Sequence, residues 1–172
     1  MSVTSAIINF ETSWSQKSTE DSNSDNTILD SGKIKYQQEY PSGVPASGID
    51  LIFHESASIV SGSSVSYDLQ NLTGTIFDNS FTKTFSKIKS ITLNNTADVS
   101  GDIDFDVSSA SGFGLPFGNP ATGINIAPNS VLYIGTKVNS ANYVVDSSNK
   151  QILLTDVNST APSYEIVILG NA

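Results

Sequence analysis

The chain has 172 residues, a formal net charge of −9 at pH 7 and no cysteine. This length suits a single domain, or a domain with an arm, whose core needs no crosslinks. The lack of cysteine excludes a disulfide framework and thiolate chemistry.

The charged residues argue against nucleic acid as a partner. All eight basic residues are lysines, whereas arginine is the side chain that best recognises phosphates and base edges. The net negative charge of the chain would in addition repel a phosphate backbone. No stretch approaches the roughly 20 apolar residues of a membrane-spanning helix, and no signal-peptide pattern opens the chain. We therefore expect neither nucleic acid nor membrane as a partner.

Residues 1–45 are predicted to form an N-terminal arm with one or two short strands. Residues 6–10 suit one short strand, and residues 33–40 alternate in the manner of a half-buried strand. The polar stretch between them has the composition of a flexible segment. We expect the arm to lie on a neighbouring subunit, with Phe10 and Trp14 as candidate contact residues.

The body is predicted to span residues 46–172, after a boundary loop at residues 41–48 with two prolines and two glycines. Short runs rich in β-branched and aromatic residues, separated by turn formers, predict an all-β body. The clearest runs are residues 49–53, 57–60, 65–69, 101–107, 131–138, 142–146, 151–157 and 163–170. The last run is apolar on both faces at residues 166–169, which predicts a strand inside a sheet, covered on both sides.

Three other stretches of the body are less regular. Residues 71–80 carry no clear pattern, and residues 108–129 read as a long loop rich in glycine and proline. The apolar residues of 85–93 fit neither the helical period nor the strand period. A short helix suits the first half of this stretch and a strand with a bulge suits the second. With about nine strands and no clear helix, we expect an antiparallel β-sandwich resembling a jelly roll.

Asp102, Asp104 and Asp106 form the most distinctive polar pattern. Their oxygen ligands suit Ca²⁺, but carboxylates two apart on a strand lie about 7 Å apart, so one ion would need ligands from other segments. The alternative is a solvated, charged face that protects a sheet edge. His54 is the only histidine, and no nucleophile elbow accompanies it. We expect no enzymatic activity, no cofactor and no resident metal.

The loop around residues 112–118 is a candidate contact surface, because Phe113, Leu115 and Phe117 place three large apolar side chains on a glycine-rich frame. Two outcomes are open. The three side chains either fill a pocket on a neighbouring molecule or fold back to cap one end of the body.

Much of the chain from residue 49 onward resembles small structural proteins of tailed-bacteriophage particles. The segments that carry this likeness are residues 65–69, 85–93, 126–132, 151–157 and 164–170. The resemblance implies a non-enzymatic virion component that decorates or cements the capsid. It further implies binding to the major capsid protein on the outer surface of the capsid, self-association as a homo-oligomer, often a trimer, and synthesis in the host cytoplasm.

Two alternatives to a cement protein remain open from the sequence. One is a tail, neck or tail-tip adhesive module that binds a host-surface glycan, which requires aromatic side chains such as Tyr36, Tyr40 and Tyr133 on one exposed face. The other is a carbohydrate-active enzyme, which requires a pair of carboxylates about 5–10 Å apart in a cleft.

Overall fold

The computed structural model describes residues 5–19, 27–41, 48–76, 79–107, 111–113, 123–136 and 143–172. Within these ranges every regular element is a strand and all strand pairs are antiparallel, so the predicted all-β antiparallel class is confirmed. The strands are β1 (Ser5–Thr19), β2 (Thr27–Pro41), β3 (Leu51–Ser58), β4 (Ser64–Asp68), β5 (Leu72–Ile76), β6 (Asn79–Lys83), β7 (Lys87–Asn95), β8 (Ile103–Asp106), β9 (Ile124–Ile126), β10 (Ser130–Gly135), β11 (Tyr143–Val144), β12 (Gln151–Asp156) and β13 (Ser163–Asn171). No helix in the described ranges has the length and apolar character needed to cross a bilayer.

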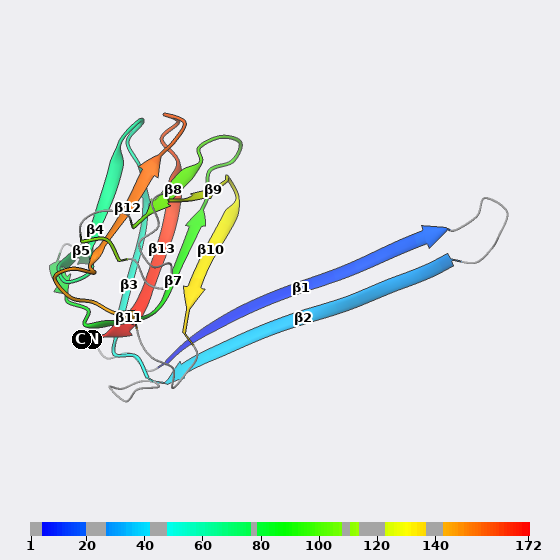
Figure 1. Cartoon of the computed structure of the whole chain (residues 1–172), viewed down its shortest axis with the longest axis horizontal. Coiled ribbons are helices and arrows are strands. Elements are labelled where there is room, and N and C mark those ends of the chain that lie inside the picture. Colours follow the sequence, from blue (N-terminus) through cyan, green and yellow to red (C-terminus); the bar gives the residue numbers. More distant parts are fainter. Residues whose placement is uncertain are drawn as a thin grey trace.

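The N-terminal hairpin, β1 paired with β2, is the element that stands apart from the others. Its register runs without interruption from Ser5 opposite Pro41 to Thr19 opposite Thr27. Figure 1 shows this hairpin extending well beyond the remaining strands. Each strand has 15 residues, which corresponds to roughly 50 Å at ~3.4 Å per residue. The expectation of short strands flanking a flexible segment therefore underestimated the regular structure here.

The first sheet of the body has the order β10-β7-β13-β3, with β11 also paired to β7. β13 lies between β7 and β3, as the doubly apolar run at residues 166–169 predicted. Residues 49–53 and 57–60 were expected as two strands, but the single strand β3 includes residues 51–53 of the first run, residues 57–58 of the second and the residues between them.

The ambiguous segment at residues 85–93 is a strand from residue 87 onward, as part of β7. Its register with β13 shifts so that Leu169 faces Ser90 while Gly170 faces Ile88, which leaves Lys89 as an extra residue. Ile88 and Ile91 are consequently both buried although they are three residues apart. This shift explains why the apolar spacing fits neither a helix nor a regular strand.

The second sheet has the order β4-β12-β8-β9. Ile103, Phe105 and Val107 are buried while the intervening aspartates are partly exposed, as alternation predicted. The two sheets contribute to one hydrophobic cluster, in which Phe53, Ile91 and Ile166 come from the first sheet and Tyr67, Phe105 and Leu154 from the second.

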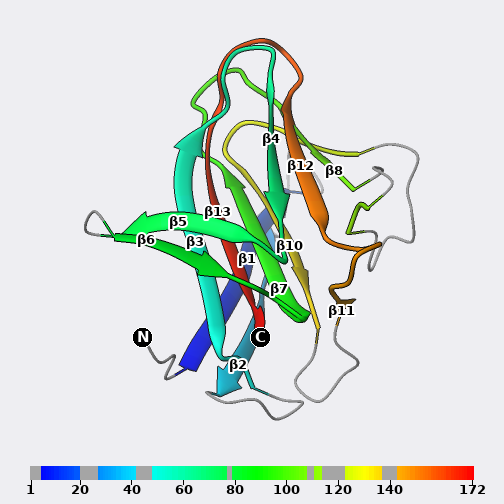
Figure 2. The same ribbon diagram turned by 90° about the vertical axis from the view of Figure 1, so that its left-hand side faces the viewer.

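Two segments that were expected to be irregular contain strands. The stretch at residues 71–80 holds β5 and the start of β6, which pair as a hairpin, and Figure 2 shows this hairpin running across β3. Within residues 108–129, β9 pairs with β8. All three strands are five residues or shorter, so their hydrophobic periodicity gave little signal.

Candidate functional site

The root of the N-terminal hairpin is seated on the outer face of the first sheet. A second, smaller cluster contains Tyr40, Ile49 and Leu169, and these are almost fully buried. Ala6 and Ile8 of β1 pack against this cluster together with Ile52 and Val167 of the sheet. We call this contact the seat. It covers the outer side of β13 at Val167 and Leu169, so this part of the central strand is buried on one side by the main core and on the other by the hairpin, while Ser163 and Glu165 stay exposed.

Tyr40 fixes the seat by a buried polar contact. Its hydroxyl donates to the carbonyl of Thr136 at 2.8 Å and lies 3.5 Å from the hydroxyl of Tyr133. Burial raises the pKa of both tyrosines above their usual value. Because both phenols stay protonated at any physiological pH, the contact does not loosen through ionisation of either ring.

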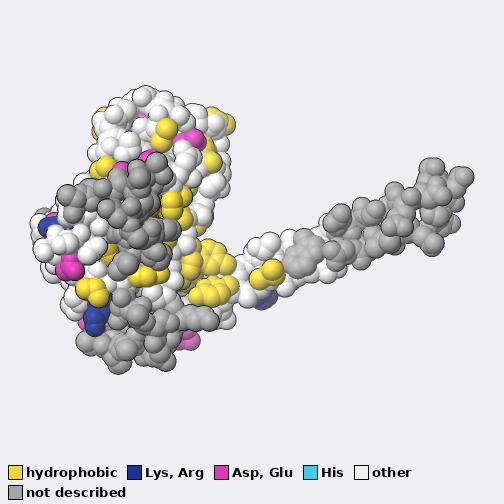
Figure 3. Space-filling model, in the orientation of Figure 1, with side chains coloured by type: hydrophobic (Ala, Val, Ile, Leu, Met, Phe, Trp, Pro, Cys, Tyr) yellow, Lys and Arg dark blue, Asp and Glu magenta, His cyan; other side chains and the backbone are white. Residues whose placement is uncertain are grey.

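An aromatic group lies where the hairpin leaves the body. The ring of Phe10 is 4.8 Å from that of Tyr133 and 6.4 Å from that of Tyr36, measured between centroids. Tyr36 and Tyr133 are also 6.4 Å apart. We call these three residues the aromatic junction. Phe10 and Tyr36 retain 36% and 38% exposure, and Figure 3 shows hydrophobic side chains gathered at this place on the surface. The junction is therefore part anchor and part accessible surface.

The hairpin beyond the seat has two chemically distinct faces. Successive cross-strand pairs point to opposite sides of a ribbon. One face carries the pairs Phe10–Tyr36 and Thr12–Ile34, which contain no charged residue, and farther out on this side the register places Gln16 opposite Asp30. We call the part formed by Phe10, Thr12, Ile34 and Tyr36 the uncharged face. Its most distal described apolar side chain, Ile34, is 64% exposed.

The opposite face of the hairpin carries its described charges. Glu11 accepts from Lys33 at 2.6 Å and from Lys35 at 3.0 Å. These two contacts lower the pKa of Glu11. Both strands thus place their ion pairs on one side, which keeps the uncharged face free of them.

The predicted contact residues fall in different places. Phe10 is part of the aromatic junction, whereas Phe113 is 1% exposed and packs edge-on against Tyr143 at 6.2 Å. Of the two outcomes considered for its loop, Phe113 follows the second and folds into the body. Leu115 and Phe117 lie outside the described residues. Trp14 is the register partner of Gly32 in the hairpin, and its side chain is outside the described part.

The three aromatic residues proposed for a glycan surface do come together. Tyr36 and Tyr133 contact each other in the junction, but Tyr40 is fully buried beneath them. Only the first two are therefore available to a ligand. Phe10, which sequence reasoning had assigned to protein contact, takes the third place.

The aspartate pattern lies on an interior strand. β8 pairs with β12 on one side and β9 on the other, so its charges do not protect a sheet edge. Burial raises the pKa of Asp104, and repulsion from Asp106 adds to this. No cluster of potential metal ligands occurs among the described residues. His54 is exposed on β3, opposite Val167.

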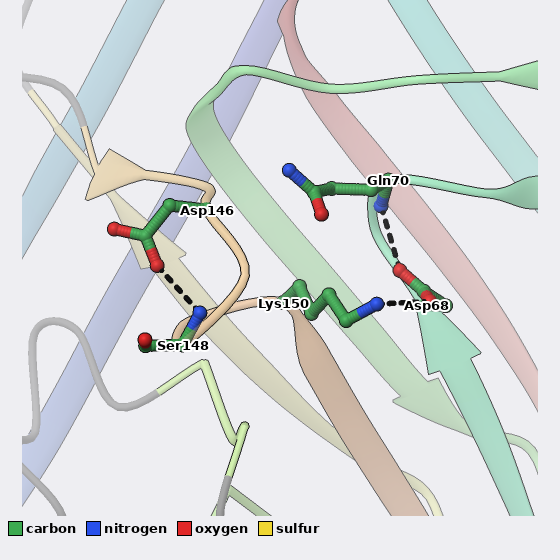
Figure 4. Close-up of polar contacts among 5 residues, drawn as sticks. All are labelled: Asp68, Gln70, Asp146, Ser148 and Lys150. Atoms are coloured by element: carbon green, nitrogen blue, oxygen red, sulfur yellow. Dashed lines mark hydrogen bonds and ion pairs between the residues drawn. The ribbon is translucent and has the colours of Figure 1, made fainter.

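Turn contacts at one end of the body involve the turn at residues 147–150. Figure 4 shows Lys150 paired with Asp68 at 2.8 Å, while the backbone N–H of Gln70 donates to the same carboxylate at 2.9 Å. In the same view Asp146 accepts from the backbone N–H of Ser148 at 2.7 Å. These carboxylates close turns, so they are engaged in holding the fold.

A cleft of about 180 Å³ lies beside this turn, between β3, β4 and β5. Its lining includes Glu55 and Asp68. The hydroxyl of Tyr67 donates to Glu55 at 2.5 Å and lies 2.6 Å from the hydroxyl of Tyr164. Since Asp68 is paired with Lys150 and Glu55 with Tyr67, both carboxylates of the cleft already have partners within the fold.

A scan of protein-family models finds no match to this chain, and searches of curated proteins and of solved structures find none either. The role of the chain is therefore inferred from its fold and from the geometry of its hairpin.

Proposed function

We propose that this chain is a non-enzymatic virion structural protein of a tailed bacteriophage. In this role it cements or decorates the outer surface of the capsid by bridging neighbouring subunits of the major capsid protein, and it acts as a homo-oligomer, as a trimer. The observation that carries the proposal is the N-terminal hairpin, which leaves the body with an uncharged face that the described part of its own chain does not cover.

The architecture suits this role. We infer that the two sheets with their shared core form a jelly-roll-like sandwich and that the hairpin is its extended arm. An isolated two-stranded sheet is marginally stable in water, because it lacks a packing partner. The body covers the root of the arm but not Ile34. A neighbouring subunit would supply the missing cover.

The length of the arm and the repetition of subunits on a shell make a weak contact per copy sufficient for stable binding. An arm of roughly 50 Å extends past the footprint of a small body and onto an adjacent subunit. Each contact on a symmetric shell is repeated many times, and bound copies are held at high effective concentration. The net charge of −9 suits a position on the outside of a shell, away from packaged DNA.

The direct test is binding to empty shells assembled from the major capsid protein of the same phage. Wild-type chain should co-sediment with the shells and raise the temperature at which they come apart. Ile34→Asp, which puts a charge on the uncharged face, should weaken binding by at least tenfold. Lys33→Gln changes the net charge equally on the opposite face and serves as the control. Failure of the wild-type chain to bind or stabilise the shells would refute the cement function.

A second candidate function, a tail, neck or tail-tip adhesive module, is favoured by the aromatic junction. A shallow hollow of about 170 Å³ on the hairpin is lined by Phe10 and Tyr36 together with polar side chains of Asn9, Glu11, Lys35 and Gln37. Aromatic rings beside hydrogen-bonding groups suit a sugar ring. Glycan-array binding that is lost in Tyr36→Ala and kept in Lys33→Gln would favour this function over cementing.

A further inference from the structure

The end of the body opposite the arm is built from four connections, which we call the loop end. They are residues 59–63 between β3 and β4, 96–102 between β7 and β8, 127–129 between β9 and β10, and 157–162 between β12 and β13. The central strand β13 starts at the loop end with Ser163 and finishes with Asn171, which donates to the carbonyl of Gly48 near the root of the arm. Its nine residues span about 30 Å. In Figure 1 the loop end lies at the top of the body, and the arm leaves from the bottom.

Hydrogen bonds join these four loops to one another. Each loop is connected to at least one neighbouring loop, so the four behave as one surface. The bonds run from Ser61 to Ser159, from Val157 to Asp102 and from Asn129 to Asp98, at 2.8, 3.1 and 2.9 Å.

Two buried polar side chains hold the loops from below. The amide of Asn95 donates to the carbonyl of Gly101 at 2.8 Å. The carboxylate of Asp156 accepts from the backbone N–H groups of Gly62 at 3.0 Å and Ala161 at 3.1 Å. Asn95 and Asp156 are both buried, so water competes little for these bonds.

The backbone of the loop end is unusual in the same places. All five described residues with a positive φ lie in these loops, namely Gly62, Gly101, Asn129, Ser159 and Ala161. Ser159 and Ala161 adopt a φ of 56°, which a side chain disfavours and which persists only where the surroundings fix it. The loops are therefore ordered before a partner arrives, and docking through them costs little conformational entropy.

Four valines are exposed at the loop end. Val99 is 92% exposed and Val60 71%, while Val157 and Val131 are about half exposed. Val131 is the second residue of β10, directly after one of the loops. Of the nine large apolar side chains exposed in the described residues, four lie here and four on the hairpin. Exposed apolar side chains gathered on ordered loops are typical of an interaction surface.

The charge of the loop end indicates the chemistry of its partner. None of the residues in the four loops is a lysine or an arginine, whereas Asp98 is exposed and Asp102 is partly exposed. On the face seen in Figure 3, acidic side chains but no lysines are visible at this end of the body. Two copies that met through their loop ends would bring like charges together. The complementary surface is instead apolar, with lysine or arginine at its margin.

We propose that the loop end is the second attachment surface of the chain. It docks on the capsid subunit next to the one that takes the arm, at an apolar patch bordered by lysine or arginine. The inference rests on the proposed cement function, because a chain that bridges two subunits needs two attachment surfaces. Since arm and loop end lie at opposite ends of the body, one copy can hold two subunits at once. A copy that loses either surface stays attached by the other but no longer bridges.

Matched valine substitutions test this on empty shells of the major capsid protein. Val99→Asp puts a charge on the loop end, and Val60→Asp does so on a different loop. Val144→Asp is the control, because it makes the same change at an exposed valine of β11, opposite Lys87 at the far end of β7. Thermal melts establish that each variant is folded.

The two loop-end variants should bind the shells at least tenfold more weakly than wild type, and Val144→Asp within twofold of it. At saturating concentration, Val99→Asp should coat the shells through its arm but no longer raise the temperature at which they come apart. Asp98→Asn should lower the salt dependence of binding, because it removes a charge from the contact. A salt dependence that Asp98→Asn leaves unchanged would contradict a partner bordered by cations.

Crosslinking identifies what the loop end touches. The chain has no cysteine of its own, so Val99→Cys can carry a single photoreactive maleimide. On the shells it should crosslink to the major capsid protein. Crosslinks formed only between copies of this chain would overturn the inference.

The failures of the two proposals can be told apart. If wild type binds and stabilises the shells and Val99→Asp does so equally well, the cement function stands and the loop end is not its second surface. If wild type does not bind the shells, the cement function is refuted and the inference falls with it.

Discussion

Replacing Tyr40 with phenylalanine should loosen the hairpin without unfolding the body. The change keeps the ring in the seat but removes the donor to the Thr136 carbonyl, 2.8 Å away and buried. Leaving a buried acceptor without its partner costs about 1–3 kcal/mol. The seat and the main core are separate clusters, so most of this cost should appear as local opening of the hairpin root. A cost of this size raises the opening equilibrium by roughly 5- to 150-fold.

Native-state hydrogen exchange can measure this opening, read at the backbone amides of β1 and β2 close to the seat. Amides of β12 in the main core report global unfolding in the same experiment. Tyr36→Phe is the matched control, because it removes a hydroxyl from an exposed side chain that does not bond to the Thr136 carbonyl and that contacts Gln38 at 3.4 Å. If Tyr40→Phe leaves exchange at the hairpin root within twofold of wild type, the buried hydrogen bond does not hold the seat. An equal loss of protection in β12 would show that hairpin and body open as one unit.

Three further changes test the body. Burial alone would raise the pKa of Asp156, but backbone N–H groups led by Gly62 outweigh it and lower the pKa. Its stabilising contribution is then fully present above the ordinary value of 3.8 and lost as pH falls through the lower folded pKa, so Asp156→Asn should lower the urea midpoint more at pH 7 than at pH 3. The pKa shift of Asp104 has the opposite sign, because its raised pKa makes the ionised form unfavourable in the fold. Asp104→Asn should therefore raise the urea midpoint at pH 7. A rise in the midpoint that persists at pH 3 would show that the charge of Asp104 is not its cause. Gly101 has φ of +113°, and an added Cβ would lie 3.0 Å from that of Pro162. Gly101→Ala should therefore cost about 1–3 kcal/mol in the free energy of unfolding, and an unchanged melting curve would show that this strain is absent.

The body was largely predictable because its strands bury one face each. Ile103 and Phe105 alternate with aspartates, so the period of two is visible in the chain itself. Burial on both sides of β13 was equally clear from its doubly apolar run at residues 166–169. The run did not indicate that the second sheet covers one side and the hairpin root the other. The Lys89 register shift was less accessible, because one extra residue changes the phase of the apolar pattern partway along the strand.

The candidate site was harder to predict, because its surface is divided between two strands. Phe10 and Tyr36 are 26 residues apart and become neighbours only through the register of the hairpin. Neither strand alone has enough apolar residues to stand out, and the serine- and threonine-rich composition suggested flexibility. A usable signal was nevertheless present: with Glu11 opposite Lys35, and Lys33 two residues before it, the charges fall on one side and the aromatic residues on the other.

This arrangement also bears on function. A hairpin that only needed to be soluble would gain from charges on both faces, and charge repulsion on an exposed sheet deters unwanted pairing. Here the ion pairs of Glu11 with Lys33 and Lys35 lie on one face, and Ile34 remains exposed on the other. Apolar exposure along a projecting ribbon costs free energy in the isolated chain unless something covers it in use. The prediction that separates Ile34→Asp from Lys33→Gln rests on this asymmetry. Equal behaviour of the two variants in shell binding would mean that the uncharged face has no partner on the shell.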